Sequence, residues 1–207
     1  MMIAFRYASV ILIGYLLGAI PVGYLAGKTR GIDVREYGSG HVGGTNVLRS
    51  AGPVLAFFTV LGDALKGMAA VLIARAILPT PIAEALAGLG AVAGHNWSVF
   101  IGFGGGVGTM TTLGALFILS PKALFITAPL GLIAALVSGY ASVGSLTISS
   151  LMPLVLLCLI AFGSQPPAYL LYGVGVAAMI IFSLRGNIQR LRAGTERRIY
   201  EKARRRE

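Results

Sequence analysis

The chain has 207 residues, of which 56% are hydrophobic and only 12% charged, and its mean hydropathy is +0.83. A soluble domain carries about 25% charged residues, so the composition excludes a soluble globular protein and predicts an integral membrane protein. The length allows about seven spans of about 20 residues and leaves no room for a separate soluble domain. We therefore expect one all-α, membrane-embedded domain over residues 1–207.

The net charge of +10 does not indicate nucleic-acid binding, because the basic residues adjoin apolar segments and no basic surface domain with interleaved aromatic residues is present. Anionic membrane lipids and phosphorylated substrates are the partners that this charge favours. Neither a nucleic acid nor an obligate protein partner is inferred.

Seven apolar segments bounded by Pro and Gly are the predicted transmembrane helices. In chain order they are residues 7–26, 53–78, 82–101, 107–119, 123–142, 145–162 and 167–184. The fourth is short, and its join to the fifth is the weakest boundary. Five longer spans with two re-entrant pieces would preserve the same arrangement of sides.

If the spans alternate, one side of the membrane receives residues 28–52, 102–106, 141–144 and the basic tail 185–207. Four basic residues in the first of these segments and nine in the tail make thirteen of the seventeen in the chain. The positive-inside rule then predicts a cytoplasmic tail, an N-terminus outside, and a multi-pass protein of the cell inner (plasma) membrane. The polar and glycine-rich clusters all fall on the cytoplasmic side.

Residues 38–49 read Gly-Ser-Gly-His-Val-Gly-Gly-Thr-Asn-Val-Leu-Arg, a polar island in an apolar chain. Flexible glycines and side-chain donors of this kind can surround a phosphate with N–H groups. The candidate binding groups in this island are Ser39, Gly40, His41, Thr45, Asn46 and Arg49. For Thr45 and Asn46, bracing of the loop is favoured over contact with substrate.

Inside the second span, Asp63 and Lys66 stand three residues apart and therefore share one helical face. Charge within a membrane is costly and is usually functional or paired. One interpretation is an ion pair that satisfies itself within the bundle. The other places Lys66 at the floor of a cytoplasmic pocket, with Asp63 orienting it or a neighbouring donor.

The third span ends at His95, and the glycine run 102–108 then opens a new helix. Backbone N–H groups at such a helix start attract anions, which makes the amides of Gly105 and Gly106 candidates for binding phosphate. The alternatives are a histidine that bonds a helix carbonyl and a glycine hinge. In the tail, much of which is a basic helix that binds anionic lipid, Asn187 is the residue whose amide we expect to reach a glycerol hydroxyl or phosphate.

Together these elements resemble the bacterial membrane acyl-phosphate:glycerol-3-phosphate acyltransferase family over nearly the whole chain. The first family motif is matched by Gly38, Ser39, Gly40, Gly43, Thr45, Asn46 and Arg49, with His41 in place of asparagine and Gly44 in place of alanine. The Asp-x-x-Lys-Gly element is matched by Asp63, Lys66 and Gly67, and the Gly-His element with its glycine loop by Gly94, His95, Gly105, Gly106 and Gly108. The terminal motif is matched by Asn187, Ile188, Arg190, Leu191, Gly194, Thr195 and Glu196.

Three positions depart from the family pattern. The family's two loop lysines are replaced by Gly104 and Val107, and its histidine three residues before Asn187 is replaced by Leu184. The resemblance implies that the second lysine and the histidine contact the phosphate-bearing substrate, and such charge-assisted contacts contribute roughly 1.5 to 3 kcal/mol each. Lys66, Arg49 and His41 are the residues available to compensate.

The resemblance implies transfer of a fatty acyl group from acyl phosphate to the primary hydroxyl of glycerol 3-phosphate, which forms lysophosphatidic acid without a cofactor or a metal. The catalytic residues expected on this basis are His95, Ser39 and Arg49. The expected substrate-binding residues are Gly40, His41, Thr45, Asn46, Lys66, Gly105, Gly106 and Asn187. His95 would orient the loop or relay a proton, and the leaving phosphate is a plausible base.

Two other functions stay open at the level of sequence. The missing cations allow a catalytically impaired paralogue that binds a phosphorylated metabolite or lipid. A small-solute transporter is disfavoured, because the last three spans supply few polar groups and the deep charge is confined to Asp63 and Lys66.

Overall fold

The computed structural model describes residues 2–206, so residues 1 and 207 of the predicted domain lie outside the described part. Over residues 2–206 the fold comprises ten α-helices and two short 3-10 helices. Among the described residues, β-type pairing is limited to two isolated bridges, Tyr37 with Arg205 and Ser98 with Gly104. The predicted all-α class is confirmed.

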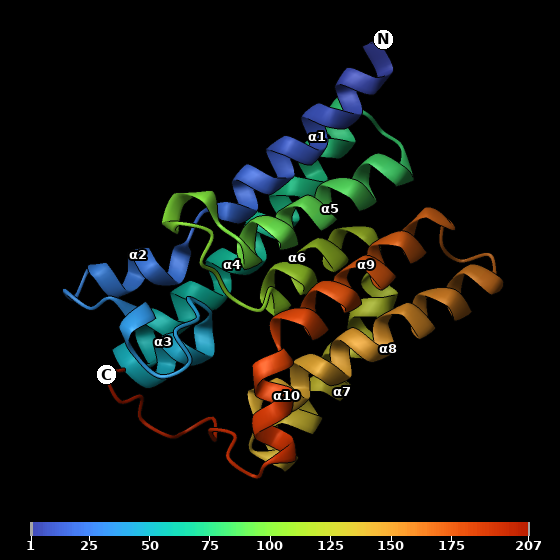
Figure 1. The fold of residues 1–207 in the computed structure, drawn as a ribbon. Helices are drawn as coiled ribbons and strands as arrows, with labels where there is room; N and C mark the ends of the chain where they lie inside the picture. Colours follow the sequence, from blue (N-terminus) through green and yellow to red (C-terminus); the bar gives the residue numbers. More distant parts are fainter. Residues whose placement is uncertain (1, 207) are drawn as a thin grey trace.

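Seven helices form the bundle, and the remaining short helices lie at one of its ends (Figure 1). The bundle helices are α1 (Met2–Ala19), α4 (Pro53–Ile77), α5 (Pro81–Asn96), α6 (Thr109–Leu119), α7 (Pro121–Ser138), α8 (Ala141–Ala161) and α9 (Ala168–Ser183). The short ones are α2 (Val22–Lys28), η1 (Val34–Glu36), α3 (Gly44–Ala51), η2 (Val99–Ile101) and α10 (Arg185–Arg192). Each of the seven predicted apolar segments therefore overlaps one bundle helix.

Fewer than seven of these helices are long and apolar enough to cross a membrane by themselves. Four segments of the described chain meet that test, namely Met2–Lys28, Pro53–Ile77, Pro121–Ser138 and Ala141–Ala161. A fifth is added if α9 and α10, which are bent by 59° at their junction, count as one span. The helices α5 and α6, with 16 and 11 residues, are the short members.

Small residues let the bundle helices approach closely. On α4, a Cβ at Gly67 would meet the backbone of Thr111 on α6, and a Cβ at Gly114 on α6 would meet the backbone of Ala64 on α4. Gly94 on α5 abuts the backbone of α1 in the same way. Close packing of this kind is typical of helices in lipid, and it gives a physical reason for the glycine that follows Lys66.

The core and the outer surface are both apolar. Leu116, Met152, Leu156, Tyr172 and Ile180 are fully buried where α5, α6, α8 and α9 meet. Large apolar side chains also cover the outside; the most exposed on the bundle helices α4, α7 and α8 include Phe57, Phe125, Val137 and Leu154. Exposing so much apolar area to water is unfavourable, whereas helices that face lipid tails are apolar on the outside.

The loops lie at two opposite ends of the bundle, as expected for spans that alternate in direction. At one end, the amide of Val42 donates to the carbonyl of Gly105 at 3.2 Å, and the tail returns from α10 toward α3 (Figure 1). At the other end, near the N-terminus, the hydroxyl of Tyr7 lies 3.4 Å from that of Thr80. Segments that are far apart in the sequence therefore meet at one polar end.

Candidate active site

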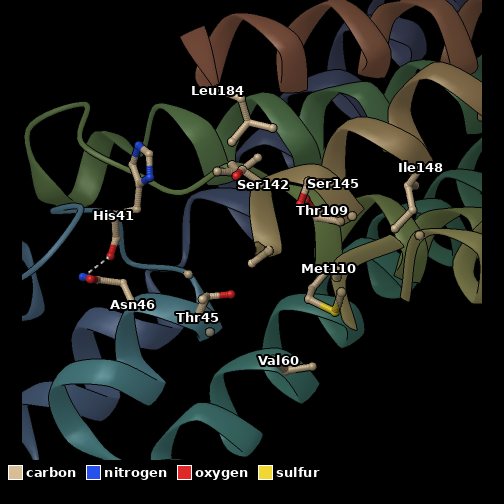
Figure 2. Close-up of a pocket in the computed structure, with 18 of the residues that line it drawn as sticks. His41, Thr45, Asn46, Val60, Thr109, Met110, Ser142, Ser145, Ile148 and Leu184 are labelled. Atoms are coloured by element: carbon tan, nitrogen blue, oxygen red, sulfur yellow. Dashed lines mark hydrogen bonds between the residues drawn. The ribbon is translucent and has the colours of Figure 1, made fainter. Parts of the chain in front are cut away.

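A cavity of about 450 Å³ opens at the polar end and runs between α4, α6, α7 and α8. Its polar lining residues are Ser39, His41, Thr45, Asn46, Arg49, Asp63, His95, Thr109, Ser142, Ser145, Asn187 and Glu196. Its main apolar lining residues are Val60, Val107, Met110, Leu113, Ala128, Leu132, Ala135, Ile148 and Leu184. Figure 2 shows Val60, Met110 and Ile148 on the opposite side of the cavity from His41. One cavity thus has a polar end with hydrogen-bonding groups and an apolar end.

Asn46 holds the polar island in shape. Its buried amide nitrogen donates to the carbonyls of Val34 at 2.8 Å, Tyr37 at 3.1 Å and His41 at 2.9 Å, while its oxygen accepts the amide of Ser39 at 3.2 Å. Because buried backbone polar groups need partners, this one side chain fixes the loop. The interpretation of Asn46 as a brace agrees with these contacts.

His41 and Ser39 present their side chains to the cavity from that loop. The amide of His41 donates to the Ser39 hydroxyl oxygen at 3.4 Å, and the imidazole points away from Asn46 (Figure 2). Burial lowers the pKa of His41, and the nearby positive charge of Arg190 lowers it further. The imidazole is therefore held toward its neutral form in a region of positive potential.

An ion-pair cluster lies at the floor of the cavity. Lys66 Nζ is 2.8 Å from Asp63 Oδ1, and Nδ1 of His95 is 3.3 Å from the same oxygen. All three side chains are buried, and Asp63 and His95 line the cavity. Lys66 does not line the cavity. Its ammonium donates to the Ile20 carbonyl at 2.9 Å and pairs with the Asp63 carboxylate. Asp63 is thus the nearest acidic neighbour of the predicted catalytic histidine.

The glycine loop supports His95. The amide of Gly106 donates to the His95 carbonyl at 3.0 Å, and a Cβ at Gly106 would collide with the imidazole. Neither Gly105 nor Gly106 lines the cavity, whereas Val107 and Gly108 do. The sequence predicts that these two amides bind phosphate. In the structure the loop instead packs against His95, and only a glycine at position 106 permits that approach.

Glu196 connects the terminal motif to α8. Its carboxylate accepts Nδ2 of Asn187 at 2.7 Å, Nε of Arg190 at 2.9 Å and the Ser142 hydroxyl at 3.1 Å. The Glu196 side chain is only 5% exposed. No role is predicted for Glu196 from the sequence alone, although it is the last residue of the terminal motif. Its partner Ser142 carried no local signal.

Arg49 binds the C-terminal tail. Its guanidinium donates to the carbonyls of Arg197 at 3.0 Å and Arg198 at 2.7 Å, and its Nε to that of Ile199 at 3.4 Å. Arg49 also lines the cavity, so the residue expected to bind phosphate joins the tail to the site.

The structure brings most of the predicted site residues together at one cavity. Those that line it are Ser39, His41, Thr45, Asn46, Arg49, His95 and Asn187; those that do not are Gly40, Lys66, Gly105 and Gly106. The Gly40 amide donates to the Tyr37 carbonyl at 2.9 Å and serves the turn. Besides Glu196 and Ser142, the hydroxyls of Thr109 and Ser145, 2.8 Å apart, belong to the cavity and were not predicted. Within residues 2–206, no group of three His, Cys, Asp or Glu is placed to hold a metal ion.

Comparison with known proteins gives concordant matches. The family model described as glycerol-3-phosphate acyltransferase matches residues 8–194. Glycerol-3-phosphate acyltransferase 2 of Moorella thermoacetica is 40% identical over 93% of this chain and 97% of its own length. The corresponding protein of Symbiobacterium thermophilum is 43% identical over 95% of this chain and 96% of its own.

Solved structures agree with this sequence similarity. The crystal structure of PlsY, an integral membrane glycerol 3-phosphate acyltransferase, in its glycerol 3-phosphate form has a TM-score of 0.84 and 35% identity, and the match covers 93% of this chain and 94% of that one. The lysophosphatidic acid form of PlsY matches with a TM-score of 0.83 and 34% identity over the same shares.

Proposed function

Because the chain belongs to the glycerol-3-phosphate acyltransferase family, we propose that it transfers a fatty acyl group from acyl phosphate to the primary hydroxyl of glycerol 3-phosphate. The chain is an integral membrane enzyme of this family, and its product is lysophosphatidic acid. The single observation that supports this chemistry is the cavity that joins a polar end to an apolar end. A soluble acceptor and a lipid-borne donor meet only in such a site.

The acyl chain of the donor would lie along Val60, Met110, Leu113 and Ile148, and its phosphate would lie toward Ser39. In the reaction, the acceptor hydroxyl oxygen attacks the acyl carbonyl carbon, and the bond from that carbon to the phosphate oxygen breaks. The hydroxyl proton leaves with the phosphate, which is a good leaving group and can accept it. No covalent enzyme intermediate is required, so positioning supplies much of the rate.

His95 is the proposed positioning group beside the reacting atoms. With Nδ1 directed at Asp63, the second ring nitrogen is held in one place against the glycine loop, which is how carboxylates orient imidazoles in other enzymes. Asn187 would donate its second amide N–H to phosphate or to the developing oxyanion, with Glu196 fixing the orientation of the amide. The Ser142 hydroxyl donates its one proton to Glu196 and so helps to hold that carboxylate. Arg49 would add the guanidinium that pairs with phosphate.

We place the protein in the plasma membrane, with its polar end facing the cytoplasm and its N-terminus on the outside. The charge bias of the loops supports this orientation. We keep seven crossings in the proposal, since α5 and α6 lie between the longer helices that pack on them. The basic tail would then contact anionic lipids of the inner leaflet.

The proposed function is tested with purified protein in detergent, palmitoyl phosphate and labelled glycerol 3-phosphate. We expect labelled lysophosphatidic acid, and we expect the double variant Ser39→Ala, Arg49→Ala to form at least about a hundredfold less, since two charge-assisted contacts are lost. Binding of glycerol 3-phosphate without product would identify the impaired paralogue instead. Product formation by the double variant at the wild-type rate would overturn the assigned site.

A further inference from the structure

The C-terminal tail, residues 197–206, follows the terminal motif and runs from the end of α10 back to α3 (Figure 1). Six of its ten residues are basic, and all of them are half-buried or exposed. Burial of apolar side chains therefore does little to hold the tail in place. Hydrogen bonds of its main chain hold it instead.

Two of these bonds connect the tail to the elements around the cavity. The Ile199 amide donates to the carbonyl of Gly139, in the turn between α7 and α8, at 2.9 Å. The Ala203 amide donates to the Arg49 carbonyl on α3 at 3.1 Å. The tail thus joins the α7–α8 turn to α3.

The end of the tail is fastened to η1 and to the start of the polar island. The Gly38 amide donates to the Arg204 carbonyl at 3.0 Å, and the Arg206 amide donates to the Glu36 carbonyl at 2.7 Å. The ion pair between Arg205 and Glu36 is largely exposed and adds little.

The guanidinium of Arg49 is held by the tail on one side only. Its Nε and Nη2 make three bonds to the carbonyls of residues 197–199. A guanidinium has five N–H groups, and these bonds use the one on Nε and both on Nη2. No acceptor within the described chain is bonded to Nη1. Because Arg49 also lines the cavity, the two N–H groups of Nη1 are free to meet a phosphate.

A long side chain loses conformational entropy when it is held in one orientation. The tail fixes the orientation of Arg49 before a substrate binds, and such preorganisation of a binding group raises the rate. We propose that residues 197–203 form a positioning strap, whose main chain orients the Arg49 guanidinium so that Nη1 points into the cavity. This inference rests on the proposed function, in which Arg49 binds phosphate. The cationic side chains of the strap take no part in it.

The test breaks two bonds of the strap with proline, which has no N–H. The double variant is Ile199→Pro with Ala203→Pro. Ile199 is the second residue of a turn in which the Glu201 amide donates to the Arg198 carbonyl at 3.2 Å, a position that proline suits. Lys202→Pro is the matched control, because the Lys202 amide is bonded to no main-chain acceptor in the part of the chain that the structure describes. The kcat and KM for acyl transfer are measured in detergent without anionic lipid.

We expect kcat/KM to fall about tenfold in the double-proline variant, because a displaced guanidinium loses its productive geometry. Lys202→Pro should stay within about twofold of the wild type. Both are then measured in an Arg49→Ala background, where the strap has no guanidinium to position, so the two prolines should cause no further loss. An equal loss in both backgrounds would mean that the prolines damage the fold, and it would overturn the strap.

Hydrogen exchange in the peptide 197–206 gives a readout that requires no activity. The amides of Ile199 and Ala203 should be protected in the wild type, and in Arg49→Ala they should exchange at least about tenfold faster. Unchanged exchange in Arg49→Ala overturns the strap, even if the double-proline variant aggregates. A wild type that shows this protection but transfers no acyl group loses only the proposed function.

A charge variant separates the main chain of the tail from its cations. Lys202→Gln with Arg204→Gln removes two exposed positive charges and keeps every main-chain bond, so we expect wild-type kcat/KM. A tenfold loss in this variant would mean that the tail acts through its charge. A gain of activity in the double-proline variant would mean that the tail restrains Arg49 from binding substrate. Either result overturns the strap.

Discussion

Two buried carboxylates tie α4 to α5, and they differ in what surrounds them. Toward the polar end, Asp63 on α4 pairs with Lys66 on the same helix and with His95 on α5. The cavity reaches Asp63 and His95, and the ring of His95 stands against the glycine loop.

At the other end, Glu84 on α5 pairs with Arg75 on α4 at 2.8 Å and accepts the hydroxyl of Tyr169 on α9 at 2.8 Å. The cavity does not reach these residues. Both carboxylate oxygens of Glu84 are occupied within the protein. A buried charge in a membrane helix therefore indicates a structural constraint, and only a buried charge that also contacts the cavity is a candidate for catalysis.

Asp63→Asn is expected to have the largest effect on activity. The amide cannot hold the imidazole as the carboxylate does, so kcat for acyl transfer should fall by about a hundredfold or more, with a smaller change in KM. Lys66 also loses its partner, so folding is checked by gel filtration, and Asp63→Asn with Lys66→Met provides a variant without the unpaired ammonium. A kcat within threefold of the wild type in a folded variant would remove Asp63 from the site.

Glu84→Gln is expected to lower the stability of the protein and to leave its activity nearly unchanged. Loss of a buried ionic contact costs about 1 to 3 kcal/mol, so the apparent melting temperature in detergent should drop. The kcat of the protein that remains folded should stay within twofold of the wild type, since Glu84 lies away from the cavity. A large loss of kcat without loss of stability would mean that the two clusters are functionally coupled.

Val107→Lys adds a cation to the lining of the cavity. Val107 is half-buried in the cavity wall, and an ammonium there would pair with the donor phosphate. We expect kcat/KM to rise about tenfold, the equivalent of one charge-assisted contact. Gly104→Lys, at a position that does not line the cavity, is the matched control. A decrease in kcat/KM would show that the apolar wall is required at this position.

Asp33 lies just before η1, outside the bundle helices, and offers a comparison with the two buried carboxylates. The hydrogen bond from Arg35 lowers the pKa of Asp33 to about 2. A carboxylate with a lowered pKa stabilises the fold fully above its unfolded pKa of about 3.9 and loses that effect as the pH falls through about 2. Asp33→Asn should therefore cost about 1 kcal/mol or less at pH 7, because Arg35 is partly exposed.

Melting curves of Asp33→Asn and the wild type at several pH values test this expectation. The difference between the two proteins should shrink between pH 4 and pH 2. A difference that grows in acid would contradict the assigned pKa.

Much of the fold follows from local sequence. The apolar segments predict all seven bundle helices, because hydropathy and Pro or Gly breaks act over one helix length. For α4 the boundary agrees to one residue, 53–78 against Pro53–Ile77. The longest disagreement is at the start of the chain, where one predicted span became α1 and α2, broken before Pro21.

The site was predictable only in part. Ser39, His41 and His95 stand in polar, glycine-rich segments whose composition marks them, and all three line the cavity. Lys66 carries an equally strong signal, yet its ammonium turns away to the Ile20 carbonyl. Its depth along α4 and the path of the chain at Ile20 decide this, and neither is encoded in the spacing of charges.

Composition and hydropathy alone determine that this chain is helical, embedded in the membrane and polar at one end, since these properties depend on how each segment partitions between water and lipid. Only the tertiary structure decides which polar groups share a cavity. Arg49 meets a tail 148 residues away, and Ser142 meets Glu196 across 54 residues. Contacts between residues so far apart in the sequence depend on how whole helices pack. The sequence of one segment does not show which other segments it will contact.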